Sequence, residues 1–113
     1  MKKIQAIVRA EKLEDLKKKI GENELANGMT VSQVLGFGQQ KGFDEYIRGQ
    51  KILTTLLAKV QIEIVVPDEK VEDLVKVIVE EAQTGEVGDG KIFIIPIEDA
   101  IRIRTGERGE KVL

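Results

Sequence analysis

A change of hydrophobic period in the second half of the chain constrains its fold most strongly. Apolar residues alternate with mostly polar ones from Val60 to Val66, which predicts a half-buried strand that Pro67 ends. Apolar residues then recur at helical spacing over residues 71–82, and Asp68 is placed to cap the N-terminus of that helix. A strand and a helix that each carry one apolar side predict a helix packed on a sheet.

The first half of the chain has the same order of elements. Residues 3–9 alternate as a strand does, and apolar residues recur at helical spacing from Leu13 to Leu25. Further strands are predicted over residues 29–34 and, after the second helix, over residues 91–97. This order predicts an α+β fold of the ferredoxin-like class, a double βαβ sandwich in which two helices cover one face of a four-stranded antiparallel sheet.

The length fits a single domain that comprises residues 1–113. Residues 38–56 fit no period and predict a long loop between the second and third strands, which in a compact domain is usually functional or disordered. Residues 100–113 form a C-terminal extension, in which isoleucines alternate with arginines over 101–104. This alternation predicts an extended segment.

The second face of the predicted sheet has no helix to cover it. In the third strand this face carries Gln61, Glu63 and Val65, so it is only partly polar. Oligomerisation would cover such a face, because a half-apolar open sheet is otherwise an exposed patch. A solvated one-sided sheet is the alternative.

Two residue types are missing, and their absence limits the chemistry. The chain has no cysteine, which excludes disulfides and thiolate ligands, and no histidine, which removes the commonest general base. Any metal must therefore be a hard cation bound by oxygens. The net charge of −2 argues against a nucleic-acid binder. The N-terminus shows neither a secretory signal nor a membrane span, so a cytoplasmic protein is expected.

The stretch "QTGEVGDGKIFII" over residues 83–95 brings three glycines together before a lysine, Lys91. Glycines let a backbone approach a ligand closely, and successive N–H groups form a nest for an anion. Residues 85–91 formally fit G-x-x-x-x-G-K, but Ile92 replaces the Ser/Thr of a P-loop, and a helix here leads into a strand. A phosphate-binding loop and a plain helix-to-strand turn both remain open. Arg102 and Arg104 would suit phosphate oxygens as a guanidinium pair.

Five stretches together resemble one family over nearly the whole chain. They are "GFGQQKG" (36–42), "YIRG" (46–49), "KVQIEIVVPD" (59–68), "QTGEVGDGKIF" (83–93) and "IRIRTGE" (101–107). On these motifs the chain resembles the PII family of nitrogen-regulatory signal-transduction proteins. The resemblance implies a homotrimer of ferredoxin-like subunits that binds ATP or ADP in clefts between neighbouring subunits.

The resemblance also implies a role for individual residues. Gly88 to Lys91 would hold the nucleotide phosphates, and arginines of the C-terminal extension would reach them from the other side of the subunit cleft. Gln40 would coordinate Mg²⁺ through its amide oxygen and meet 2-oxoglutarate, and Lys59 would pair with the far carboxylate of that keto acid. The full set implied for ATP or ADP is Thr30, Gly38, Gln39, Gln40, Val65, Gly88, Asp89, Gly90, Lys91, Arg102, Ile103 and Arg104.

The implied function is that of a non-catalytic sensor. It would couple ATP or ADP and 2-oxoglutarate to protein targets through the long loop, and these targets would include an ammonium transporter or a nitrogen-metabolism enzyme. Contact with a membrane is expected only through a transporter, and no nucleic acid is expected. Ile52 stands where many bacterial members carry a uridylylated tyrosine, so no modification is expected there.

Two other functions are alternatives to this one. A small ATPase or phosphoryl-transfer protein could use the same phosphate site, but only Glu86 and Asp89 flank the glycines as carboxylates, and both are expected in a surface turn. An RNA-binding module would stack bases on aromatic residues of the sheet, whereas the chain lacks a basic footprint, and Phe93 is expected in the core.

Overall fold

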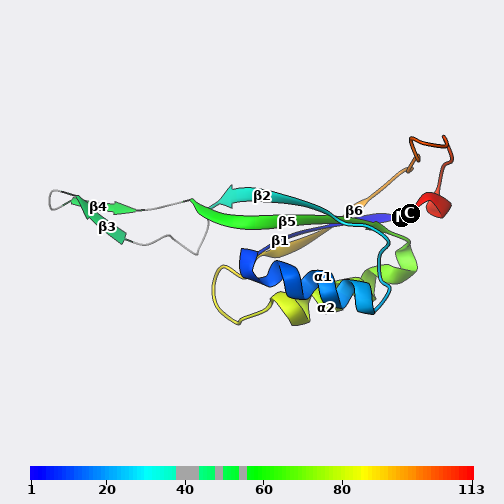
Figure 1. Ribbon diagram of the computed structural model, residues 1–113. Helices are drawn as coiled ribbons and strands as arrows, with labels where there is room; N and C mark the ends of the chain where they lie inside the picture. Colours follow the sequence, from blue (N-terminus) through cyan, green and yellow to red (C-terminus); the bar gives the residue numbers. More distant parts are fainter. Residues whose placement is uncertain (38–43, 48–49, 54–55) are drawn as a thin grey trace.

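The computed structural model describes residues 1–37, 44–47, 50–53 and 56–113 of the chain. A four-stranded antiparallel sheet with the order β2-β5-β1-β6 carries both α-helices on one face (Figure 1). Its elements are β1 (Lys2–Val8), α1 (Leu13–Glu22), β2 (Thr30–Gly36), β5 (Leu57–Val66), α2 (Val71–Ala82) and β6 (Lys91–Pro96). The predicted α+β, ferredoxin-like fold is confirmed.

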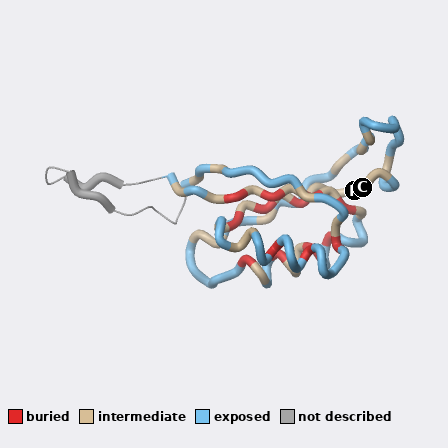
Figure 2. The backbone as a smooth tube through the Cα atoms, viewed as in Figure 1, coloured by how far each residue is buried: buried red, intermediate tan, exposed pale blue. Residues whose placement is uncertain are grey.

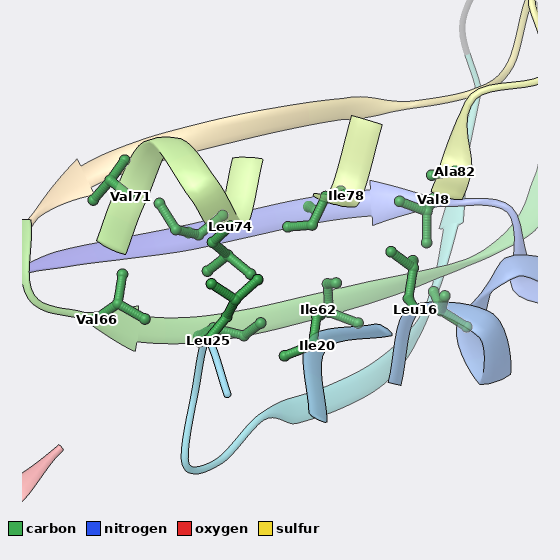
Figure 3. Packing of buried hydrophobic residues seen from close by; sticks show 14 residues of the cluster. Val8, Leu16, Ile20, Leu25, Ile62, Val66, Val71, Leu74, Ile78 and Ala82 are labelled. Atoms are coloured by element: carbon green, nitrogen blue, oxygen red, sulfur yellow. The ribbon is translucent and has the colours of Figure 1, made fainter. Parts of the chain in front are cut away.

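The core lies between the sheet and the helices, where Figure 2 shows the buried positions. Alternate residues of β1 and β5 face the helices, and Ile4 lies opposite Ile64 in the antiparallel register. In Figure 3, Leu74 of α2 and Leu16 of α1 point into this layer, and both side chains are fully buried. Burial of such side chains stabilises the fold by about 1.5–3 kcal/mol each.

The opposite face of the sheet is mixed in character. Phe93, Gln5, Glu63 and Thr30 lie side by side on it across the four strands. The amide of Gln61 donates to Glu63 Oε1 at 2.9 Å. The prediction that Phe93 belongs to the core is wrong: its side chain is 44% exposed, because the two-residue period of β6 sends its neighbours towards the helices instead.

The end of α1 differs from its prediction. The helix ends at Glu22, and Leu25 follows it although its side chain is buried. Glu24 adopts a left-handed conformation with φ of 52°, and the N–H of Leu25 donates to the carbonyl of Ile20. This is a Schellman motif, so Leu25 reaches the core as the apolar residue after the helix rather than as part of its stripe.

The start of α2 also differs from its prediction. Asp68 does not cap the helix; it begins a short 3-10 turn over Asp68–Lys70. Its carboxylate accepts hydrogen bonds from Lys2 Nζ at 2.9 Å and from the amino group of Met1 at 3.0 Å. These hydrogen bonds, with that from Lys2 the larger cause, hold the pKa of Asp68 below its usual value. Asp68 therefore links the start of β1 to the turn before α2 and does not cap the helix.

The segment predicted as a loop contains regular structure. Within residues 38–56, β3 (Asp44–Ile47) and β4 (Gln50–Leu53) pair antiparallel as a separate two-stranded sheet. Strands of four residues are too short to show a clear alternation of side chains in the sequence. They can still pair, because the hydrogen bonds between strands are made by backbone groups. None of the helices within the described ranges has the length and apolar run that a membrane-spanning helix needs.

Candidate functional site

The glycine loop, residues 83–90, joins α2 to β6. Gly85, Gly88 and Gly90 all have positive φ angles, of 88°, 104° and 102°. Gly90 also packs directly against β1: a Cβ built on it would lie 1.7 Å from the carbonyl oxygen of Ile7. No other residue fits there without displacing backbone, so Gly90 fixes the loop at the end of β1.

Asp89 holds the glycine loop together from within. The N–H groups of Thr84 and Gly85 donate to Asp89 Oδ2 at 2.7 and 2.9 Å, and the hydroxyl of Thr84 donates to Oδ1. The hydroxyl of Thr84, followed by these backbone amides and Arg9, keeps the pKa of Asp89 far below its usual value. The carboxylate is therefore a structural anion of the loop, consistent with the surface-turn role predicted for it.

Two cations bind the loop from the sheet. Arg9 Nε donates to Asp89 Oδ1 at 3.1 Å, and Arg9 Nη2 donates to the carbonyl of Val87 at 2.9 Å. From β5, Lys59 Nζ donates to the carbonyl of Gly88 at 2.8 Å. Burial and then repulsion from Arg9 lower the pKa of Lys59. No sequence pattern marks Arg9 as a functional residue, because its partners lie 78 and 80 residues away in the chain.

A cleft of about 450 Å³ opens beside the loop. Its lining combines apolar side chains with ammonium groups, two carboxylates and glycine backbone: Ile7, Gly36, Phe37, Leu57, Lys59, Glu86, Val87, Gly88, Asp89, Gly90, Lys91 and Phe93. The volume and the mixed lining are typical of small-ligand sites. The apolar part suits a flat or hydrophobic group, and the cations suit an anion. The structure thus brings Lys59 together with the predicted residues Gly88 to Lys91.

The C-terminal turn, residues 99–109, lies at the other end of the sheet (Figure 1). The predicted extended segment over 101–104 is wrong, because the N–H of Gly106 donates to the carbonyl of Arg102 at 2.7 Å and closes a turn. Arg102 Nη1 donates to Glu107 Oε1 at 2.8 Å. Ile103 is 99% exposed, and Arg104 is exposed beside it.

The predicted nucleotide residues therefore fall into two separate groups. Thr30 and Val65 lie on the open sheet face near the end that carries the C-terminal turn, whereas Gly88 to Lys91 lie at the opposite end (Figure 1). Within one chain the structure does not bring these two groups together. The predicted residues Gly38, Gln39 and Gln40 lie outside the described residues. Across the part of the chain that the structure describes, no group of three or more acidic side chains could hold a metal ion.

Comparison with known proteins identifies the family. The family model described as nitrogen regulatory protein P-II matches residues 1–107. The chain is 47% identical over 113 residues to a nitrogen regulatory protein P-II of Haemophilus influenzae, with all of both chains covered. It is 50% identical over 109 residues to that of Rhodospirillum rubrum, with 96% of each chain covered, and 48% identical over 113 residues to nitrogen regulatory protein P-II 1 of Escherichia coli K12, again in full. The chain belongs to the nitrogen regulatory protein P-II family.

Proposed function

We propose that this P-II protein is a non-catalytic homotrimeric sensor. It binds ATP or ADP between subunits, binds 2-oxoglutarate when Mg²⁺ and ATP are present, and regulates partners in nitrogen metabolism through residues 38–56. One observation carries the proposal: the glycine loop and the C-terminal turn, which we propose as two halves of a site, lie at opposite ends of the same sheet (Figure 1). Such a pair can meet only when two chains associate.

The glycine loop supplies groups that fit the phosphates. Its glycines have backbone conformations that L-residues rarely adopt, and Lys91 begins the strand that follows. Lys59 adds a second ammonium at the cleft. Backbone amides and ammonium groups are the donors that polyphosphates need, and the apolar lining by Phe37 and Phe93 offers a surface to the adenine or ribose.

The C-terminal turn supplies the other half. Arg102, Ile103 and Arg104 would contact the nucleotide held by the glycine loop of the neighbouring subunit. A contact between two different ends of a subunit is heterologous, and it closes into a ring when the rotation allows it. Three subunits arranged so would also cover the mixed sheet face, where Ile7 and Val65 accompany the polar side chains.

The keto acid would bind at the same end as the glycine loop. Lys59 would pair with its far carboxylate, and Gln40 would present an amide oxygen to Mg²⁺ together with the phosphates and the keto acid. An all-oxygen set suits this hard cation, which would neutralise the charge of the phosphates. Because Lys59 stands on β5, just after residues 38–56, binding there can change the preference of that segment among its conformations.

The regulatory output would be a change in partner affinity. A coupling of this kind typically amounts to about 1–3 kcal/mol between effector and partner. An ammonium transporter or an enzyme of nitrogen metabolism is the partner class that we propose. The alternative of a small ATPase is not favoured, because Asp89 already binds Thr84, Gly85 and Arg9 and is a poor general base at neutral pH.

Calorimetry tests the proposal. We expect 2-oxoglutarate to bind only when Mg²⁺ and ATP are present, and to bind much more weakly after Lys59→Ala or Gln40→Ala. Lys18→Ala is the matched control, since Lys18 is an exposed lysine of α1. Binding without nucleotide, or unchanged binding in both site variants, would exclude the assignment. Light scattering should give about three times the subunit mass of 12.6 kDa.

A further inference from the structure

We propose that Arg9 is a positioning residue that sets the direction of the Val87–Gly88 peptide, so that the N–H of Gly88 faces an anion instead of the protein. The inference rests on the proposed function, because the anion would be the phosphate group of the nucleotide. Arg9 belongs to none of the stretches that carry the family resemblance, and its hydrogen bonds alone connect it to the loop.

The end of β1 is the template on which the loop is fixed. Ile7 and Arg9 are two residues apart, and each holds a different part of the loop. The carbonyl of Ile7 lies against Gly90, and the guanidinium of Arg9 holds Val87 and Asp89. Gly88 lies between the two residues that Arg9 contacts. The loop therefore cannot shift along the strand without breaking one of these contacts.

The hydrogen bond to Val87 sets the peptide direction. All peptide bonds in the described residues are trans, and the C=O and N–H of a trans peptide point in opposite directions. Because the carbonyl of Val87 points to Arg9 Nη2, the N–H of Gly88 points away from Arg9. The φ of 104° at Gly88 is consistent with this direction of the peptide. A β-turn whose central peptide is flipped relative to type I is a type II turn, and its third residue needs a positive φ.

Without Arg9 the opposite peptide direction becomes accessible. A glycine adopts either sign of φ at little cost, so the Val87–Gly88 peptide can turn its carbonyl outwards. A carbonyl oxygen facing a phosphate repels it, whereas an N–H donates to it. The hydrogen bond from Lys59 is accepted by the carbonyl of Gly88, which belongs to the following peptide.

Arg9 acts through the loop and not as a ligand. Its side chain is only 15% exposed, and its Nε and Nη2 groups are already engaged by Asp89 and Val87. It does not line the cleft. Two bonds in different directions from one planar group require the guanidinium fork, which a lysine cannot reproduce. Arg9→Lys should therefore keep the positive charge but not both hydrogen bonds.

Titration calorimetry with ATP tests this role. We expect Arg9→Met to weaken ATP binding by about tenfold, because a charge-assisted hydrogen bond that orders the site is lost. Arg9→Lys should recover only part of that loss. Lys17→Met is the control, since it removes the same charge from an exposed ion pair with Glu14 on α1 and should bind as the wild type does. Wild-type affinity in either Arg9 variant would overturn the inference.

Two further measurements separate a positioning role from a general loss of stability. Arg9→Met combined with Asp89→Asn should weaken ATP binding by little more than the stronger single change, since both act on one loop. Fully additive losses would overturn the inference. In the free protein, Arg9→Met should also change the carbonyl ¹³C shift of Val87 and the amide exchange of Gly88, and unchanged signals would overturn it. If the wild type binds no ATP, the proposed function fails, and these signals still decide the role of Arg9.

Discussion

The glycine loop and the C-terminal turn are both short segments at the ends of one sheet, but they are held in different ways. Besides its internal hydrogen bonds to Asp89, the glycine loop is bound by residues far away in the chain: Arg9 lies 80 residues from Asp89, and Lys59 lies 29 residues from Gly88. The C-terminal turn is bound by its own residues. Arg102 and Glu107 are five residues apart, and Arg108 lies nine residues from Asp99.

This difference shows which contacts fix the conformation of each segment. The glycine loop is fixed in place by β5 and by the residue that follows β1, so the direction of its Val87–Gly88 peptide depends on the folded sheet as well as on the loop's own hydrogen bonds. The C-terminal turn carries its shape with it and presents Ile103 almost fully to solvent. A self-contained turn with an exposed isoleucine and arginines is suited to reach a surface of another chain, whereas the loop is suited to be that surface.

The largest effect should come from a methyl group in the glycine loop. Gly90→Ala puts a Cβ against the carbonyl of Ile7 at a φ of 102°, so it should lower the free energy of unfolding by at least about 3 kcal/mol. Gly106→Ala is the matched change in the C-terminal turn: φ is 73°, and a Cβ there meets nothing within 4 Å. It should cost only about 1–2 kcal/mol, from backbone strain alone.

Urea unfolding at one fixed protein concentration measures both variants, since the stability of an oligomer depends on concentration. Equal losses in Gly90→Ala and Gly106→Ala would mean that contact with β1 does not distinguish the loop from the turn.

The second effect concerns the association of the two segments. Lys91→Ala in the loop and Arg104→Ala in the turn should each weaken ATP binding by about tenfold or more, through loss of a charge-assisted phosphate contact. If both segments of one chain served one site, mixing the two variants would restore nothing. If neighbouring chains share each site, unfolding and refolding an equal mixture should restore about a quarter of the sites to full affinity, as random pairing in a ring requires.

The sequence predicted the framework of the molecule better than the bonds that hold its site. The alternation in β5 and the stripe in α2 are local patterns, so both elements and the fold class followed from them. The glycines were also visible, but only the packing against Ile7 distinguishes Gly90 from Gly85, whose added Cβ would meet nothing within 4 Å. Arg9 carried no signal, because its role arises from contacts between residues that the fold alone brings together.

The C-terminal turn illustrates the opposite error. The alternation of isoleucine with arginine resembles a strand, but Gly106 has a φ of 73° and returns the chain on itself. The N–H of Arg102 then donates to the carbonyl of Glu107 at 2.9 Å and closes the turn. Four alternating residues are too few to outweigh a glycine that favours a turn.

The third effect is the loss of folding stability at low pH. The pKa of Asp89 and the pKa of Asp99 are both lowered, that of Asp89 mainly by the hydroxyl of Thr84 and that of Asp99 mainly by Arg108. A lowered pKa contributes stability that is present above the ordinary value near 3.9 and is lost as the pH falls through the folded value. The shift at Asp89 is the larger, so Asp89→Asn should flatten the loss of stability between about pH 4 and pH 2 more than Asp99→Asn does. Unfolding midpoints of the wild type and of both variants across this pH range measure the two effects. A larger effect of Asp99→Asn would mean that the C-terminal turn, and not the glycine loop, is the more sensitive to acid.

The smallest expected difference comes from two threonines in matched turns. The N–H of Glu86 donates to the hydroxyl of Thr84, and the N–H of Glu107 donates to that of Thr105. Only Thr84 also donates, to Asp89. Thr84→Val should therefore lower the free energy of unfolding by about 1–2 kcal/mol and Thr105→Val by less than about 1 kcal/mol, since one variant loses two hydrogen bonds and the other loses one. Urea midpoints of the two variants, with Thr→Ser at each position to retain the hydroxyl, measure the difference. If Thr105→Val proved the more harmful, the hydroxyl of Thr105 would contribute more to its turn than the hydroxyl of Thr84 contributes to the loop.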